Sequence, residues 1–132
     1  MNNKTLRTRI ANACENVFYM SETDERIEPF FGGHTASVTK DTILEAEGKT
    51  GSIQIEEIET ASFFERVTKI NEWYGEAENE NAKRWRELRD LLTENLRDLR
   101  IFKTGRIRID IYIVGIDAEG NLMGVKTKAV ET

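Results

Sequence analysis

The chain has 132 residues, of which 39% are hydrophobic and 33% are charged, and its formal net charge at pH 7 is −5. This length and composition exclude a disordered or fibrous chain and predict one domain over residues 1–132, large enough to bury a core without disulfides. Charged residues interrupt the long apolar runs, which argues against a membrane span and a secretory leader and leads us to expect a cytoplasmic protein.

The N-terminal region is predicted to be a helix followed by an acidic loop. Its apolar side chains recur at spacings of four, three and four residues: Leu6, Ile10, Ala13 and Val17. This period indicates an amphipathic helix from about residue 4 to about residue 19. The segment YMSETDERIEPFF, residues 19–31, breaks the period with four carboxylates and is predicted to be a loop held by Pro29. We interpret Cys14, the only cysteine, as a small buried side chain of the helix.

Three short elements are predicted in the middle of the chain. Thr39 and Thr42 begin a helix that Gly48 ends. Alternating apolar and polar residues indicate a strand between residues 51 and 60. Ser62 and Glu65 have the spacing of a capping box, which predicts another helix over about residues 61–68.

The longest predicted element is a helix over residues 77–99. Its apolar residues form one stripe: Ala82, Trp85, Leu88, Leu92, Leu96 and Leu99. On the outer side, Glu80 with Arg84 and Arg86 with Asp90 have the i,i+4 spacing of helical ion pairs. We therefore expect a helix of about five or six turns that packs on one face.

The C-terminal region is predicted to form a β-hairpin. One strand alternates isoleucines with polar residues, and the isoleucines are expected to face the core together: Ile107, Ile109, Ile111 and Ile113. The segment DAEGN, residues 117–121, has the composition of a turn, and LMGVKTKAV, residues 122–130, returns as a strand. Helices that mostly precede strands predict an α+β fold with a mostly antiparallel sheet.

The sequence contains little of what catalysis requires. His34 is the only histidine and has no adjacent nucleophile, so neither a Ser/His/Asp nor a Cys/His arrangement is indicated. No motif for binding a metal ion or a nucleotide occurs in the sequence. We therefore predict that the protein is not an enzyme and uses no cofactor and no metal ion of its own.

A basic stretch makes nucleic-acid binding an alternative. Residues 83–108 hold nine Lys or Arg against four Asp or Glu, and a nucleic-acid site would use Lys83, Arg84, Arg86 and Arg89. However, acids interleave with these cations and no stacking aromatics do, so a solvated helix face is the simpler interpretation.

Two acidic segments are more informative. Residues 20–28 carry four acids and one base, and residues 72–80 carry four acids and no base. The second segment holds Trp73 and Tyr74, so Trp73 is either packed under the start of the long helix or is an exposed anchor. An aromatic anchor among carboxylates suits a cationic groove built for a polyanion, which predicts competitive blocking of such a groove.

Four ordered segments resemble the nuclease A inhibitor family: FYMSE at 18–22, SFFERVT at 62–68, EWYGEAENENA at 72–82 and IDIYIVGIDAEGNLMGVKTKAVET at 109–132. Members of that family bind and silence a sugar-non-specific, magnesium-dependent nuclease. The resemblance implies an αβα sandwich with helices on both faces and a 1:1 complex with the nuclease, without direct binding to nucleic acid or membrane. The remaining alternative is an interaction domain of the same fold with a different protein partner.

The resemblance also implies which residues bind the partner. Glu22 would reach into the nuclease active site toward its magnesium ion, Glu72 and Trp73 would lie at the interface, and Thr132 would lie near them. The chain has Glu72 where the family pattern has aspartate and Gly75 where it has an acid. With the neighbouring acids and Tyr74, the predicted partner-binding set is Glu22, Asp24, Glu25, Glu72, Trp73, Tyr74, Glu76, Glu131 and Thr132.

Overall fold

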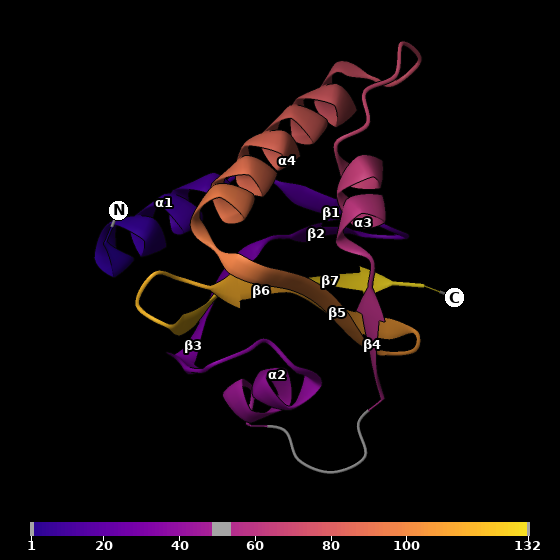
Figure 1. Cartoon of the computed structure of the whole chain (residues 1–132). Coiled ribbons are helices and arrows are strands. Elements are labelled where there is room, and N and C mark those ends of the chain that lie inside the picture. Colours follow the sequence, from indigo (N-terminus) through magenta and orange to yellow (C-terminus); the bar gives the residue numbers. More distant parts are fainter. Residues whose placement is uncertain (1, 49–53, 132) are drawn as a thin grey trace.

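The structure, a computed structural model, describes residues 2–48 and 54–131 (Figure 1). Its helices are α1 (Asn3–Cys14), α2 (Lys40–Ala46), α3 (Thr60–Val67) and α4 (Glu76–Asn95). Its strands are β1 (Phe18–Met20), β2 (Asp24–Arg26), β3 (Glu28–His34), β4 (Ile55–Ile58), β5 (Arg97–Gly105), β6 (Arg108–Ile116) and β7 (Asn121–Val130). Over the described ranges, no helix combines the length and the apolar character that crossing a membrane requires.

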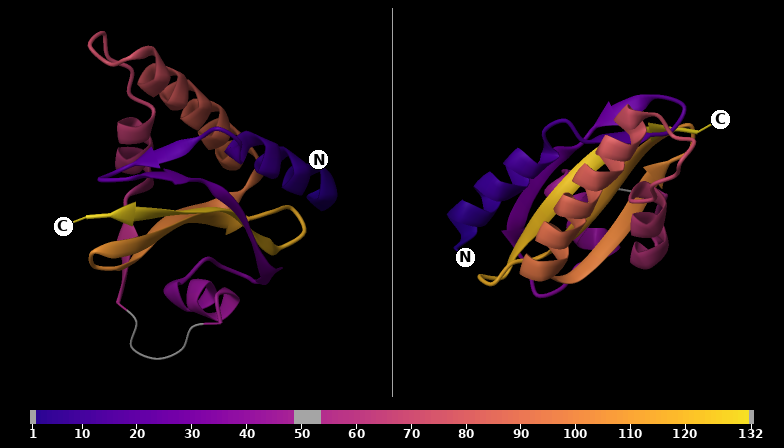
Figure 2. Two further views of the ribbon diagram at one scale, coloured as in Figure 1. Left: turned by 180° about the vertical axis from the view of Figure 1, so that it is seen from behind. Right: turned by 90° about the horizontal axis from the view of Figure 1, so that it is seen from above.

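Five strands form one sheet in the order β3-β7-β6-β5-β4, and β1 and β2 form a separate hairpin. The strand pairings in the described residues are all antiparallel. The predicted α+β fold with a mostly antiparallel sheet is therefore confirmed. The hairpin lies beside β7, where the Thr127 hydroxyl donates a 2.9 Å hydrogen bond to the carbonyl oxygen of Arg26 (Figure 2).

Helices pack on both faces of the five-stranded sheet (Figures 1 and 2). One face carries Ile109, Ile111 and Ile113 into a cluster with α1, α3 and α4. The alternate residues of β6 form a second cluster with Phe30 of β3 and Ile43 of α2. Alternate residues of a strand point to opposite faces, so β6 is buried on both sides.

Ile107 does not face the core, contrary to the prediction. The strand β6 begins at Arg108, so Ile107 lies in the turn after β5, and 59% of its side chain is exposed. The sequence pattern also predicts a polar opposite face of this strand, but Tyr112 on that face is buried, with its hydroxyl donating a 3.1 Å hydrogen bond to Glu47 Oε2. The local alternation of the sequence does not reveal the second helical layer that covers this face.

The first helix is shorter than predicted, and the acidic loop is mostly strand. α1 ends at Cys14 because Asn16 adopts a left-handed backbone with φ of 60°, which a helix cannot continue. Phe18–Met20 then pairs with Asp24–Arg26, and Glu28–His34 joins the main sheet. The segment predicted as a loop is therefore a hairpin followed by an edge strand.

The short helices are close to the predicted positions, but one cap differs. The reciprocal hydrogen bonds of a capping box join Thr39 and Thr42 at the start of α2. At α3 the predicted capping box is wrong, because the helix begins at Thr60 and the Ser62 hydroxyl instead donates a 3.1 Å hydrogen bond to Glu59. The predicted strand is observed as Ile55–Ile58, and residues 51–53 lie outside the described residues.

α4 is the predicted long helix, but it ends at Asn95 rather than at residue 99. Leu96 takes an extended backbone and Leu99 belongs to β5. The predicted pair of Glu80 with Arg84 is present at 3.5 Å, whereas Asp90 pairs with the adjacent Arg89 at 3.0 Å.

Asp98 joins the start of β5 to the segment that leads into α2. Its carboxylate accepts a 2.9 Å hydrogen bond from the Val38 amide and a 3.0 Å bond from Arg100 Nε. The Val38 amide bond, followed by the Arg100 guanidinium, lowers the pKa of Asp98 below its ordinary value of 3.8. The stabilisation is therefore present above pH 3.8 and is lost as the pH falls through the lowered pKa.

Asp98→Asn is expected to lower the free energy of unfolding by about 1 kcal/mol at neutral pH, because the neutral amide accepts more weakly than the partly exposed carboxylate. Asparagine also tolerates the φ of 54° at this position. Urea unfolding at a series of pH values checks this expectation. The difference from the wild type should shrink at acid pH, and a difference independent of pH would contradict the role given to the charge.

Candidate functional site

Three segments far apart in the sequence lie on the same side of the molecule. They are the turn between β1 and β2, the segment that leads into α4, and the end of β7 near the C-terminus (Figures 1 and 2). They contain most of the residues that the sequence predicts for partner binding. Thr132 lies outside the described residues.

Glu22 is exposed at the turn between β1 and β2, and the backbone around it is held by the last strand. The Glu22 amide donates a 3.3 Å hydrogen bond to the Val130 carbonyl oxygen. The Val130 amide in turn donates a 3.0 Å bond to Ser21 Oγ, and that hydroxyl donates a 3.3 Å bond to the Thr23 carbonyl oxygen. These bonds hold the turn against the end of β7, so the position of Glu22 is fixed by the fold.

The base of the hairpin is held by α4. Trp85 Nε1 donates a 2.9 Å hydrogen bond to the Phe18 carbonyl oxygen. The Asn81 side chain accepts from the Phe18 amide at 2.8 Å and donates to the Phe18 carbonyl at 2.9 Å. Both backbone groups of Phe18 are therefore satisfied by α4, which explains why the short strand is ordered.

Tyr19 connects the hairpin to α3. Its buried ring stacks on Phe63 with centroids 5.7 Å apart, and its hydroxyl accepts a 2.9 Å hydrogen bond from Arg66. Burial raises the pKa of Tyr19, the Arg66 guanidinium opposes that rise, and the Glu131 carboxylate adds to it. Glu131 therefore lies within electrostatic reach of the hairpin.

Trp73 is exposed over 81% of its side chain and Tyr74 over 40%. Trp73 is therefore exposed and is not packed under the start of α4. The segment that leads into α4 is held by α4 itself. The Asn79 side chain accepts a 3.4 Å hydrogen bond from the Asn71 amide and donates a 3.2 Å bond to the Asn71 carbonyl oxygen. A groove of about 330 Å³ lined by both Met20 and Tyr74 joins this segment to β1.

The predicted acids fall into two groups. Glu72 and Glu76 are exposed on either side of Trp73 and Tyr74, and Glu131 follows the end of β7. Asp24 and Glu25 instead line a groove that also contains Lys126 and Lys128 and the paired strand residue Glu28. The chain's own cations thus lie beside Asp24 and Glu25, which reduces the field that these two acids present to a partner.

Several residues at this site were missed from the sequence. Met20 and Ile70 are exposed hydrophobic side chains on this side, and Ser21 and Arg66 position the hairpin. Met20 is the last residue of β1, in a segment predicted to be a loop. The contacts of Ser21 and Arg66 join residues 109 and 47 positions apart, so no local pattern reveals them.

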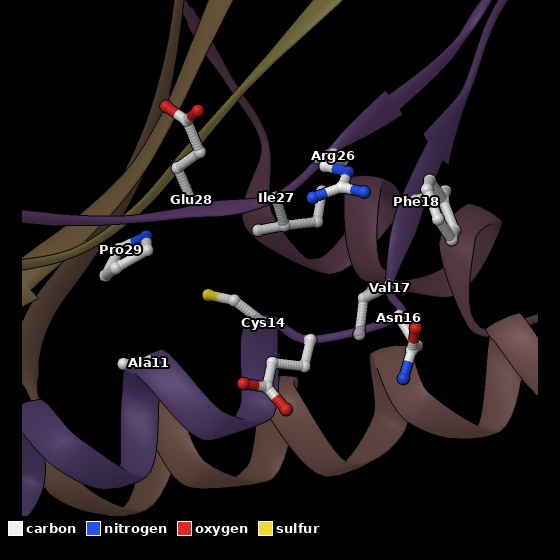
Figure 3. A pocket seen from close by; sticks show the side chains of 10 residues that line it. Ala11, Cys14, Asn16, Val17, Phe18, Arg26, Ile27, Glu28 and Pro29 are labelled. Carbon is white, nitrogen blue, oxygen red and sulfur yellow. The ribbon is translucent and has the colours of Figure 1, made fainter.

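A separate groove of about 440 Å³ lies between the end of α1 and the strands β2 and β3 (Figure 3). Cys14 lines it but is only 6% exposed, as the sequence interpretation predicts. Burial, together with the nearby Glu28 carboxylate, raises the pKa of the Cys14 thiol to about 12. The thiolate, which is the reactive form, is therefore scarce at neutral pH.

Cys14 is expected to react with a disulfide reagent such as DTNB at least about 100-fold more slowly in the folded protein than in urea at pH 8, since only about one thiol in 10⁴ is ionised when the pKa is near 12. The rate of thionitrobenzoate release measures this. Equal rates in the two states would show that the thiol is accessible and its pKa ordinary.

The described residues contain no group of three or more His, Cys, Asp or Glu side chains arranged to hold a metal ion. The site combines an exposed glutamate at a hydrogen-bonded turn with exposed aromatic residues on the same side of the molecule, a combination typical of protein-binding surfaces. A small α+β domain with such a surface belongs to the class of protein-binding domains. The chain belongs to the nuclease A inhibitor-like protein family, whose family model matches residues 4–132. No curated protein matches the chain.

Proposed function

We propose that this protein inhibits a sugar-non-specific, magnesium-dependent nuclease by placing the turn between β1 and β2 in its active site. The family supports a nuclease as the partner. The observation that carries the mechanism is the exposed Glu22 at a turn fixed by hydrogen bonds to Val130. Its carboxylate takes the place of a substrate phosphate near the magnesium ion of the nuclease.

The chemistry of such a cleft favours a carboxylate. A nuclease active site attracts phosphate with Lys, Arg and metal ions, and Mg²⁺ binds carboxylate oxygens readily. A flexible acidic tail would lose affinity to the entropy of ordering it. The turn is already ordered by the bonds of Ser21 and Glu22 to Val130, so less of the binding free energy is lost on association.

Trp73 and Tyr74 supply apolar contact area beside the carboxylate. Tyrosine and tryptophan dominate the energetics of many protein interfaces because they bury large surfaces with few rotatable bonds. Glu72 and Glu76 flank them, Glu131 follows the end of β7, and Thr132 belongs to the same proposed set. With one such surface on each molecule, we expect a 1:1 complex.

A stoichiometric titration tests the proposal. Increasing amounts of the protein are added to purified nuclease A, and cleavage of DNA and of RNA is followed separately. Both activities should fall in parallel and reach an end point near equimolar, because one blocked active site serves both substrates. Full activity in the presence of a tenfold excess of the protein would refute the proposal, as would recovery of activity with added Mg²⁺, which would indicate chelation.

The nucleic-acid alternative has less support in the structure. Arg84 pairs with Glu80 at 3.5 Å and bonds the Asn16 carbonyl oxygen at 3.2 Å, and Arg89 pairs with Asp90. These contacts neutralise two of the four cations in question. Fluorescence anisotropy with labelled DNA at about 50 mM salt distinguishes the two functions, since direct binding that weakens steeply with salt would favour the alternative.

A further inference from the structure

Exposed hydrophobic side chains are concentrated near the candidate site. The large hydrophobic residues that the described chain exposes are Met20, Phe31, Ile70, Trp73, Tyr74 and Ile107. Phe31 lies in β3 under the guanidinium of Arg7, 4.8 Å from its ring centroid. Ile107, 59% exposed, is second only to Trp73 in this set, and it contributes nothing to either hydrophobic cluster.

Ile107 lies close to Glu22 although 85 positions separate them in the sequence. The Glu131 amide donates a 2.9 Å hydrogen bond to the Ile107 carbonyl oxygen, and Arg108 pairs with Val130 across the sheet. Val130 in turn bonds Glu22 and Ser21. The backbones of Arg108 and Glu22 are thus two hydrogen-bonded strand spacings apart, about 10 Å. Figures 1 and 2 show both turns at the side of the molecule where the chain ends.

The turn that carries Ile107 is held in one conformation. Gly105 has φ of 92°, in the left-handed region, and a Cβ at this position would meet the carbonyl oxygen of Arg108 at 2.3 Å. The Glu131 amide fixes the other side of the turn. Ile107 is thus presented at a fixed place with the exposed Arg106 and Arg108 on either side.

We propose that the turn between β5 and β6 is a second docking element for the nuclease, with Ile107 against an apolar patch and Arg106 and Arg108 against carboxylates at the rim of the cleft. The inference rests on the proposed function. It adds an apolar patch and carboxylates on the nuclease, neither of which the Glu22 turn requires. The turn and Glu22 lie at the same side of the molecule, so a wholly cationic partner surface would repel the two arginines. The partner must therefore carry acidic groups beside its cationic cleft.

The proposed docking surface is acidic at one end and basic at the other. The segment that leads into α4 lies on one side of the turn between β1 and β2, and the turn between β5 and β6 lies on the other (Figure 1). Opposite charges on two sides of a central anchor fix the orientation of the complex and disfavour nucleases whose rim is basic throughout. The turn thus adds affinity for a nuclease with an acidic rim, while Glu22 supplies the contact at the metal site.

Inhibition constants for nuclease A test the proposal with three variants. Ile107→Ala should raise the inhibition constant at least tenfold. Arg106→Glu combined with Arg108→Glu should slow association at least tenfold at low salt, with a smaller effect at high salt, because charge repulsion is screened. Glu22→Gln is included to report on the proposed function itself.

Matched controls carry equivalent changes on other parts of the surface. Phe31→Ala truncates an exposed hydrophobic side chain in β3, and Lys40→Glu reverses a charge in α2. Neither should change inhibition by more than about twofold, since exposed groups outside an interface contribute little. Circular dichroism and thermal unfolding of each variant establish that it is folded.

The outcomes separate the two proposals. If wild-type protein does not inhibit nuclease A, the proposed function and this inference fail together. If it inhibits and Glu22→Gln weakens inhibition, while Ile107→Ala and the double charge reversal behave like the controls, only the second docking element is refuted. Hydrogen exchange of the wild-type complex is an independent measurement: the Arg106 and Ile107 amides should exchange more slowly than in the free protein, and unchanged exchange would also refute it.

Discussion

Glu22→Gln is expected to weaken the complex with nuclease A by about 2–5 kcal/mol, the loss typical when one partner of a desolvated charge pair is removed. Glutamine keeps the size and shape of the side chain but removes its charge. The cation of the nuclease would then be left without its partner in a site that excludes water. Glu22→Gln should still fold, because the amide of residue 22 keeps its hydrogen bond to the Val130 carbonyl oxygen, and thermal unfolding of the variant checks this.

Titrations of nuclease activity with wild type and Glu22→Gln measure this loss directly as a ratio of inhibition constants. Glu45→Gln is the matched control, because Glu45 is an exposed carboxylate of α2, which packs on the opposite face of the sheet from α4. It removes the same charge, so any effect of net charge on association appears in both variants. Equal inhibition constants for Glu22→Gln and the wild type would exclude Glu22 as the group that meets the metal ion.

The parts of the fold that could be predicted are those with a strong local pattern. α4 carries an apolar stripe over five turns, and α2 begins with a capping box that closes between residues three positions apart. The hairpin of β6 and β7 has a turn in which Gly120 adopts φ of 85°, as its composition suggests. Each of these signals depends on residues only a few positions apart, so it can be recognised in the sequence alone.

The predictions are wrong where contacts between residues distant in the sequence determine the local structure. The apolar period of α1 continues through Val17, but Asn81 and Trp85 of α4 bind the backbone of Phe18 and favour an extended strand there. The position of Ile107 in a turn depends on where β5 and β6 separate. Such outcomes depend on tertiary contacts, which override local propensity.

The candidate site was predictable in part for the same reason. The acids and Trp73 stand out by composition, and the family resemblance identifies Glu22 among them. Which acids a partner meets depends on the fold, and Asp24 and Glu25 turn out to lie beside Lys126 and Lys128 of the same chain. The hydrogen bond between Ser21 and Val130, which holds Glu22 in place, joins residues 109 positions apart, so no local pattern reveals it.

Trp85→Ala is expected to lower the free energy of unfolding by about 3–5 kcal/mol, a large part of the total stability of a domain this size. Trp85 is 1% exposed, and its ring packs edge-on against Phe63 with centroids 5.8 Å apart. Alanine leaves a cavity in the cluster between α4 and the sheet and removes the Nε1 donor to Phe18. Chemical unfolding followed by circular dichroism measures the change, and an unchanged midpoint would contradict the packing described here.

The two tryptophans separate stability from binding. Trp73→Ala should change the free energy of unfolding by no more than about 0.5 kcal/mol, because most of its side chain is already in water. It should nevertheless weaken nuclease inhibition, since truncating an aromatic anchor commonly costs about 2 kcal/mol or more.

Trp85→Phe keeps most of the ring and loses only the donor, and Asn81 still bonds Phe18. A protein that loses inhibition with Trp85→Phe while remaining fully folded would show that the hairpin, and with it the position of Glu22, depends on that single hydrogen bond.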